Sequence, residues 1–253
     1  KALIIKSAND IAIALAEGVG QTYGDFIEEM NTTAKKLGMT RTRFVNPNGL
    51  PAVEQVTTAR DLARLAKAVR RDYPQYSHYW ATPSVRVGRR RLRSHNSLLR
   101  TLEGADGMKT GFICDSGFNI VASAERDGRN LIAIVLGATT SRKRSVRAAN
   151  LLEHGFETYG WKLFFNTSSL DSVPASTKSM QVTSIRRTLP SRTCNPGLAR
   201  RLRANRRAQR RRLRKLRKTH QRAVRRSKRA HKQKTAKGKA SVSRPKNVTA
   251  SGG

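Results

Sequence analysis

The stretch GADGMKTGFICDSGFNIVASAERDGRNLIAIVLGA, residues 104–138, decides how this chain folds. It opens on a glycine turn and continues as two apolar runs separated by Asp127-Gly128. Apolar runs of this length around an Asp-Gly pair predict two antiparallel strands joined by a tight turn. The stretch therefore predicts a β-hairpin, and the segment just before it reads Lys-Thr-Gly.

Lys109-Thr110-Gly111 is a candidate binding segment within that stretch. A lysine here is expected at the edge of a strand, and Gly111 leaves room for a ligand backbone to lie along the strand. The alternative is an ordinary edge-strand lysine before a bend. On three residues alone that alternative is favoured, so the segment needs support from elsewhere in the chain.

The spacing of apolar residues predicts helices on both sides of the hairpin. The expected helices cover residues 7–20, 24–37, 57–73 (with Thr57 or Thr58 as its N-cap) and 145–160, and a short basic hairpin covers residues 84–93. Helices first, then a strand pair and a closing helix, favour an α+β fold with an antiparallel sheet flanked by helices.

The first expected helix begins at Ser7-Ala8-Asn9 and carries a candidate pair of polar groups. Ser7 is the expected N-cap, and Ile11, Leu15 and Val19 are expected to form the buried face. A hydroxyl and an amide two residues apart can also point into a cleft together. Taken alone, capping by Ser7 and local hydrogen bonding by Asn9 are the favoured interpretation.

Charge is distributed unevenly along the 253 residues, whose formal net charge is +36. All 16 Asp and Glu lie in residues 1–177, whereas residues 178–253 hold 27 Lys and Arg and no acid. Such an acid-free segment repels itself and has too few large apolar residues to offset its ordering entropy. We therefore expect a folded domain in residues 1–166, a Ser/Thr/Pro-rich linker in 167–197, and a basic tail, disordered or partly helical, in 198–253.

The two cysteines give little guidance, because Cys114 and Cys194 lie on opposite sides of this boundary. We expect no structural disulfide between them. Two Cys and five scattered His show no metal-ligand spacing, so no metal or other cofactor is expected. The sequence contains no run of about 20 apolar residues, so no transmembrane helix is expected. No signal peptide is visible in a chain that begins at Lys1.

Five ordered segments resemble one family, the D-alanyl-D-alanine carboxypeptidases, or low-molecular-mass penicillin-binding proteins, whose serine-peptidase superfamily also contains the β-lactamases. The resemblance covers about residues 1–165. The segments are KALIIKSANDIAIALAEGVG, LGMTRTRFVNPNGLP, TTARDLARLAKAV, ADGMKTGF and SGFNIVASAERDGRNLIAIVLG. The resemblance implies a transpeptidase-like fold, and it supports a functional interpretation of both Ser-Ala-Asn and Lys-Thr-Gly.

The resemblance also implies roles for the residues that match the family's motifs. Such enzymes cleave the terminal D-Ala-D-Ala bond of peptidoglycan stem peptides by acyl transfer to a serine, and β-lactams inhibit them covalently. Ser7 and Asn9 match the motif that supplies a proton-relay hydroxyl and a substrate-holding amide. Lys109 would supply positive charge and Thr110 a hydroxyl near the substrate carboxylate, with the substrate lying along the strand at Gly111.

Arg144 falls near the place where these enzymes have a carboxylate-binding arginine. Arg142, Lys143 and Arg147 crowd the same stretch. The alternative for Arg144 is a solvated residue at the start of a helix, and this alternative stays open.

The family's third motif, Ser-x-x-Lys, marks the departure from the pattern. In the family it lies upstream of Ser-x-Asn, but only six residues precede Ser7. The one Ser-x-x-Lys spacing here is Ser243 to Lys246, in the basic tail, and we interpret it as a chance match. We therefore expect an N-terminally truncated domain, incomplete in its sheet and catalytically inactive as given.

The basic tail has two interpretations. A +27 segment is expected to bind polyanions by counterion release, and its Arg-rich part can become helical on an acidic surface. It contains no aromatic residue to stack on bases, which disfavours specific single-strand recognition. The alternative is an inert or artefactual tail, for instance from a frameshift.

These observations predict a serine-type D-Ala-D-Ala carboxypeptidase of the periplasm or cell envelope, acting on peptidoglycan stem peptides. The runner-up is a noncatalytic polyanion-binding protein that acts through its basic tail.

Overall fold

The computed structural model describes residues 1–165, 170–172, 182, 184–191, 193–195, 197–205, 207–211, 213–214, 216–217, 219 and 221. The chain divides into two units, Lys1–Cys194 and Asn195–Gly253. In the second unit, residues 197–205 and 207–211 are helical. Among the described residues, no helix has both the length and the apolar character needed to cross a membrane.

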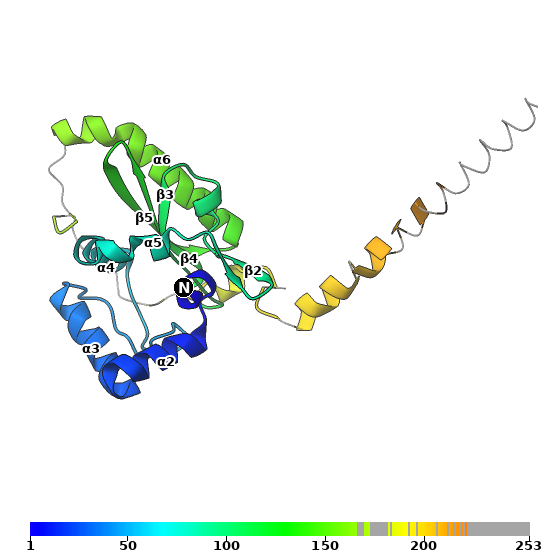
Figure 1. Ribbon diagram of the computed structural model, residues 1–253, viewed down its shortest axis with the longest axis horizontal. Coiled ribbons are helices and arrows are strands. Elements are labelled where there is room, and N and C mark those ends of the chain that lie inside the picture. Colours follow the sequence, from blue (N-terminus) through cyan, green and yellow to red (C-terminus); the bar gives the residue numbers. More distant parts are fainter. Residues whose placement is uncertain are drawn as a thin grey trace, which may run out of the picture. The chain divides into compact units, whose positions relative to one another are not determined.

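The first unit is an α+β structure, as the sequence predicts (Figure 1). Its α-helices are α1 (Ala2–Lys6), α2 (Asn9–Gly20), α3 (Tyr23–Lys36), α4 (Ala59–Asp72), α5 (Ser77–Trp80) and α6 (Ser141–Phe165), with short 3-10 turns η1 (Pro74–Tyr76), η2 (Leu98–Arg100) and η3 (Arg186–Thr188). Its strands are β1 (Ser84–Val87), β2 (Arg90–Arg93), β3 (Ala105–Ile113), β4 (Gly117–Arg126) and β5 (Arg129–Ala138).

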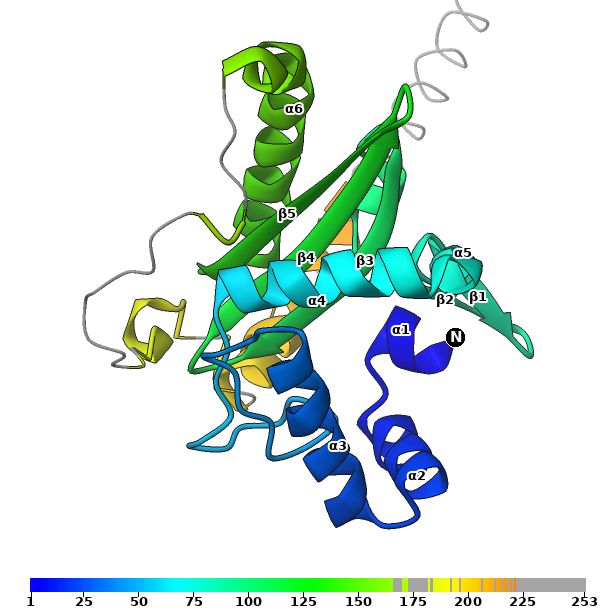
Figure 2. The same cartoon turned by 90° about the vertical axis from the view of Figure 1, so that its left-hand side faces the viewer.

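The main sheet has the order β3-β4-β5 and is antiparallel throughout. The predicted hairpin around Asp127-Gly128 is confirmed as β4 and β5, and both turn residues have positive φ, as a tight hairpin turn requires. The predicted basic hairpin is confirmed as β1 and β2. Helix α6 covers one face of the sheet and α4 crosses the other (Figure 2).

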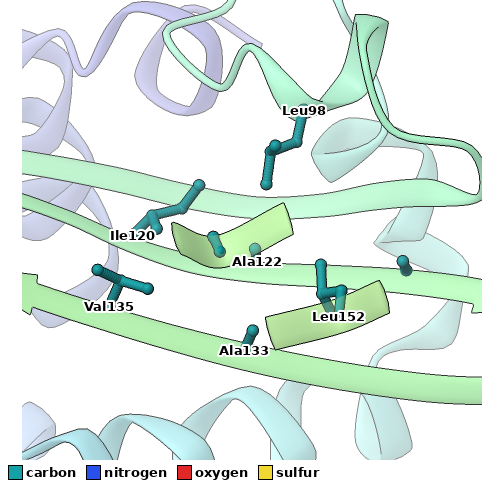
Figure 3. Close-up of a cluster of buried hydrophobic side chains, with 8 residues drawn as sticks. Leu98, Ile120, Ala122, Ala133, Val135 and Leu152 are labelled. Atoms are coloured by element: carbon teal, nitrogen blue, oxygen red, sulfur yellow. The ribbon is translucent and has the colours of Figure 1, made fainter. Parts of the chain in front are cut away.

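The core lies between the sheet and α6. Alternate residues of β4 point to the same face, so Ile120, Ala122 and Ala124 are all buried there. Leu152 of α6 and Leu98 of η2 close over them (Figure 3). The small alanines let α6 approach the sheet closely, which fixes the position of the first turn of α6 relative to β3 and β4.

The start of α2 differs from the sequence prediction. Ser7 is not an N-cap: it ends α1 in the left-handed conformation at φ 51°, and Ala8 precedes α2 without a side-chain cap. The predicted buried face is also wrong, since Leu15 and Val19 are 49% and 66% exposed. The buried side of α2 carries Ala12 and Ala16 instead, because packing against the neighbouring helices selects the small side chains.

Ile11, the third residue of the predicted apolar face, is also exposed, at 37%. Helical spacing was therefore correct for the existence of the helix and wrong for its orientation. By contrast, Thr58 caps α4 as expected, because its hydroxyl accepts a hydrogen bond from the Asp61 backbone N–H at 3.1 Å.

The expectation of unpaired cysteines is wrong, because Cys114 and Cys194 form a disulfide. Residues 184–191 and 193–194 belong to the stretch interpreted as a linker, and they return to the turn between β3 and β4. The Ile185 N–H donates to the carbonyl oxygen of Asp115, the residue after Cys114, at 2.8 Å.

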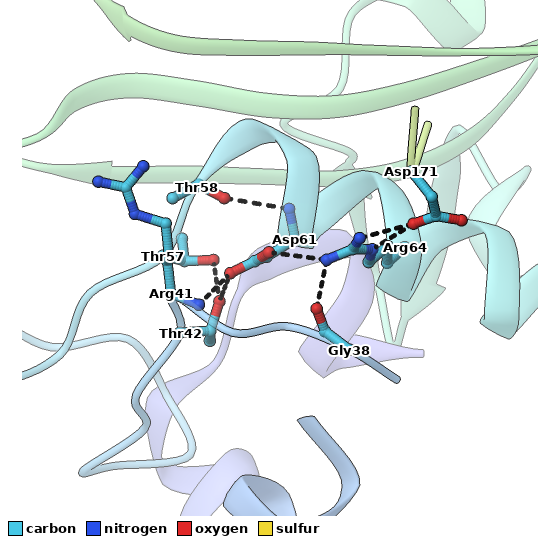
Figure 4. Close-up of polar contacts among 8 residues, drawn as sticks. All are labelled: Gly38, Arg41, Thr42, Thr57, Thr58, Asp61, Arg64 and Asp171. Atoms are coloured by element: carbon cyan, nitrogen blue, oxygen red, sulfur yellow. Dashed lines mark hydrogen bonds and ion pairs between the residues drawn. The ribbon is translucent and has the colours of Figure 1, made fainter. Parts of the chain in front are cut away.

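A buried carboxylate, Asp61, ties α4 to the loop before it (Figure 4). Asp61 is 1% exposed and accepts hydrogen bonds from the Arg41 backbone N–H at 3.0 Å and the Thr42 hydroxyl at 2.8 Å. Arg64 lies 3.8 Å from its other oxygen. A buried carboxylate is stable only with such partners, so Asp61 is the hub of this corner.

Replacing Asp61 with alanine should lower the free energy of unfolding by about 3 kcal/mol, because it leaves the Arg41 N–H and the Thr42 hydroxyl buried without their acceptor. Urea denaturation of the variant measures this. Glu17→Ala on the exposed surface of α2 is the control and should change stability by less than about 0.5 kcal/mol. An Asp61→Ala variant as stable as this control contradicts the role of the hub.

Candidate active site

The Lys-Thr-Gly segment lies in the middle of β3, whose described hydrogen-bonding partner in the sheet is β4 alone. Lys109, Thr110 and Gly111 face Val121, Ile120 and Asn119 of β4. A Cβ added at Gly111 would meet only the Asn119 Cβ, at 3.9 Å. Nothing in the described chain requires glycine at this position. The absence of a side chain at Gly111 leaves open space beside the strand.

Ser7 is brought to this strand by the turn between α1 and α2. Its left-handed backbone directs the hydroxyl toward β3, where the Lys109 ammonium donates a hydrogen bond to Ser7 Oγ. The same ammonium donates to the Thr110 carbonyl oxygen at 2.8 Å. Two motif residues that lie 102 positions apart in the sequence are therefore in direct contact.

Arg144 stands behind Lys109 in the first turn of α6. It is 4% exposed, and its Nη2 donates to the His95 carbonyl oxygen at 3.1 Å, while its Nε has no hydrogen-bond partner. The solvated-residue alternative for Arg144 is therefore excluded by its burial. In the part of the chain that the structure describes, no carboxylate forms an ion pair with Arg144 or Lys109.

The electrostatics of this pair follow from burial and from their mutual repulsion. Burial lowers the pKa of Lys109, and the neighbouring Arg144 charge lowers it further. Burial likewise lowers the pKa of Arg144. A partly buried and a buried cation side by side, without a counterion among the described residues, are unfavourable, and an anion placed between them would relieve both the desolvation and the repulsion. The arrangement is suited to binding a carboxylate.

Asn9 is the one candidate that the structure leaves apart from the others. It is the exposed first residue of α2. Among the described residues, no hydrogen bond joins its side chain to Ser7, Lys109 or Arg144. Thr110, in contrast, is only 9% exposed and lies beside Lys109 on the strand.

Two residues of the site were missed by the sequence reasoning. His95 supplies the carbonyl that holds Arg144, and burial, followed by Lys6, Lys109 and Arg144, lowers the pKa of its imidazole.

Asn96 is 2% exposed; its amide donates to the Gly107 carbonyl oxygen at 3.0 Å and its Oδ1 accepts from the Leu98 N–H at 3.1 Å. It therefore anchors β3 just before Lys109. In the sequence, the one feature that could have pointed to Asn96 is its position just before the apolar pair Leu98-Leu99.

A cavity of about 440 Å³ adjoins the segment on the α4 side of the sheet. Lys109, Thr110 and Gly111 line it, together with apolar residues of α4 that include Leu62 and Leu65. An apolar wall with one cationic edge suits a small, mostly apolar ligand that carries a terminal carboxylate. Among the described residues, no group of three or more His, Cys, Asp or Glu could hold a metal ion.

Comparison with known proteins identifies the family. The model of the D-alanyl-D-alanine carboxypeptidases, peptidase S11, matches residues 1–140. The D-alanyl-D-alanine carboxypeptidase DacC of Escherichia coli is 41% identical over 160 residues, which are 63% of this chain and 40% of that protein. The chain thus spans about two fifths of the length of the curated relatives it matches.

Solved structures agree on the fold. Penicillin-binding protein D2 from Listeria monocytogenes, in its cefotaxime-bound form, is 38% identical and superposes with a TM-score of 0.57 over 61% of this chain and 64% of that one. Penicillin-binding protein 5 from Haemophilus influenzae is 33% identical, with a TM-score of 0.59 over 61% of this chain and 46% of that one.

Replacing Lys109 with methionine should raise the free energy of unfolding by about 1–2 kcal/mol at pH 7, because it removes a partly buried charge and keeps the apolar stem. The unfolded chain binds the Lys109 proton more tightly than the folded chain does. Wild-type stability therefore rises with pH between the lowered pKa and the ordinary value of 10.5, and the variant loses that rise. Urea denaturation between pH 7 and 11 measures both effects.

The matched control is Lys143→Met at the exposed start of α6. It should change stability by less than about 0.5 kcal/mol and keep the pH dependence. If Lys109→Met destabilises the protein instead, the lysine is held by favourable contacts and is not a strained cation awaiting an anion.

Proposed function

This chain belongs to the D-alanyl-D-alanine carboxypeptidase family, and on that premise we propose that residues 1–165 form the carboxylate-binding and proton-relay part of a serine-type D-Ala-D-Ala carboxypeptidase site. Its substrates are peptidoglycan stem peptides that end in D-Ala-D-Ala, and β-lactams are its covalent inhibitors when a nucleophile is present. The site of action is the periplasm or cell envelope.

One observation carries this proposal: the Lys109 ammonium contacts Ser7 Oγ, with the buried Arg144 behind it. β3, the α1–α2 turn and α6 come together there, and among the described residues no acid forms an ion pair with Lys109 or Arg144. The free carboxylate of a terminal D-Ala is an anion of the right size for that position, and the Thr110 hydroxyl lies on the same strand to accompany it.

The direction of the Lys109–Ser7 hydrogen bond gives Ser7 its role. Lys109 donates to Ser7 Oγ, so the hydroxyl proton of Ser7 is directed to another acceptor. In acyl transfer the leaving amine needs a proton, and Ser7 is placed to deliver it. Asn9 holds the substrate amide at the start of α2, and Gly111 lets the substrate backbone lie against β3.

Acyl transfer also needs a nucleophile, and these 253 residues carry the family's Ser-x-x-Lys spacing only at Ser243 to Lys246. A nucleophile must lie within hydrogen-bond reach of its base and of the bond to be broken. We propose that residues 1–253 alone bind the carboxylate but form no acyl-enzyme.

The intact mass after incubation with benzylpenicillin tests this proposal. Residues 1–253 should gain no adduct. A chimera that joins a relative's upstream segment containing Ser-x-x-Lys to Lys1 should gain one covalent adduct per chain. In the chimera, Lys109→Met should slow acylation roughly 100-fold or more, because a preorganised charge at the reacting group is lost, whereas Lys143→Met should not.

Each outcome decides something. An adduct on residues 1–253 alone places a reactive serine within this chain and overturns the proposed division of the site. A folded chimera that takes up no penicillin overturns the carboxypeptidase assignment. Equal acylation of the Lys109→Met and wild-type chimeras removes Lys109 from the site.

The basic second unit favours polyanion binding as a second function. Its described helical residues include Arg200, Arg203, Arg207 and Arg210, all exposed. Exposed arginines on a segment without acids bind phosphate or carboxylate polymers through counterion release.

Affinity for heparin or polyphosphate should fall at least tenfold between 50 and 200 mM salt, as several neutralised charges require. Deleting residues 195–253, which leaves the first unit and its disulfide intact, should abolish it. Fluorescence anisotropy measures both. Binding that survives the deletion would assign the activity to the folded unit.

A further inference from the structure

The described residues 184–191 and 193–194, here called the strap, lie on the turn that joins β3 to β4. Asp115 in that turn is their main partner. It accepts hydrogen bonds from the Ser184 hydroxyl at 2.8 Å and from Arg186 Nη2 at 3.0 Å, and its carbonyl accepts from the Ile185 N–H at 2.8 Å. The strap thus contacts the sheet through side chains and backbone at a single turn.

The disulfide fixes the strap at its far end. Cys114 immediately precedes Asp115, and Cys194 is the last residue of the first unit. Their Cα atoms are 5.8 Å apart, and the bond closes a loop across 80 positions of sequence. Between the two attachments, Leu189 is buried at 6% exposure and η3 forms a single turn.

The ion pair between the strap and the turn is weak. Arg186 and Asp115 are 56% and 43% exposed, and an exposed ion pair contributes little because water and salt screen it. Ordering the strap costs conformational entropy at every residue. A covalent bond lowers that cost in advance, because it keeps the strap near the turn even when the contacts open.

The turn that the strap holds is the end of the substrate strand. Gly111, Phe112 and Ile113 line a cavity whose wall also includes Val182 and Ile185. Phe112 is 41% exposed, and the β4–β5 pairing is irregular between Phe118 and Ile120. This end of the sheet therefore has little cover of its own.

Ile185 supplies part of that cover. Its side chain lies against Gly117, the first residue of β4, where φ is +72° and no side chain could fit beneath it. Glycine at 117 therefore serves both the turn and the seat of the strap.

We propose that Cys114, Asp115 and Cys194 are positioning residues for the carboxypeptidase site: together they form a redox-sensitive clasp that holds the strap on the β3–β4 turn and keeps residues 111–113 of the substrate strand in place. The assignment of β3 as the substrate strand rests on the proposed function. In an oxidising compartment the clasp is closed.

Opening the clasp is a two-electron reduction. A dithiol supplies two electrons and two protons, the Sγ–Sγ bond of Cys114–Cys194 breaks into two thiols, and the dithiol becomes a disulfide. The strap then depends on its noncovalent contacts alone, and the cover at the end of β3 is held less firmly.

Hydrogen exchange of the full chain tests the clasp, with the disulfide intact and after reduction by dithiothreitol and alkylation. Exchange should accelerate roughly tenfold or more in residues 111–118 and 184–190, and change less than twofold in residues 146–156 of α6. No ligand is present, so the result does not depend on what the site binds.

Variants separate the covalent from the polar contribution. Cys114→Ser/Cys194→Ser should reproduce the reduced pattern. Asp115→Asn, with the disulfide intact, should accelerate exchange in residues 184–190 much less than reduction does. Its matched control is Asp127→Asn in the β4–β5 turn, which should leave both segments unchanged.

Three results would overturn the proposal. Equal exchange before and after reduction shows that noncovalent contacts suffice. Acceleration of all segments alike, α6 included, shows a general staple and not a clasp on the substrate strand. Two titratable thiols in the denatured, unreduced chain show that the cysteines are not bonded.

Discussion

Two neighbouring cations, the partly buried Lys109 and the buried Arg144, set the constraint on which the site depends. Neither has a carboxylate partner in the described chain, and burial lowers the pKa of both. Such a pair persists only where packing and hydrogen bonds of the surrounding structure keep the two charges in place. Here α6 packs on the sheet through the alanines of β4, and Asn96 fixes the backbone just before Lys109. The core thus determines the distance between the cations.

Those parts of the fold that depend on local chemistry could be predicted from the sequence. Asp127-Gly128 predicts the β4–β5 hairpin because only a few residues tolerate its backbone, and Thr58 predicts the start of α4 because it caps. The orientation of α2 could not be predicted, because two sets of apolar residues lie at helical spacing. One set begins at Ile11 and the other at Ala12. Tertiary packing alone decides which of the two faces inward.

The candidate site divides in the same way. Lys109, Thr110 and Arg144 are candidates because the family resemblance marks them, and Ser7 is a candidate by its motif, although its predicted capping role is wrong. The contacts of His95 and Asn96 were not foreseeable, since each acts through a backbone group that the fold brings near. The Cys114–Cys194 bond was not predicted, because the change in charge along the sequence indicates an end of the folded domain before Cys194. The chain folds back beyond that boundary and brings Cys194 to Cys114.

The cations themselves argue for an anion-binding role. A chain freed from that role would gain stability by losing either charge, since a methionine fills the place of Lys109 without the cost of desolvation. Local conflict of this kind is typical of functional sites, where binding is retained at the expense of stability. The direction of the Lys109–Ser7 hydrogen bond adds a second requirement, because it leaves the serine proton to be given away. Charge and proton direction together support the proposed ligand, a carboxylate with a proton-accepting group beside it.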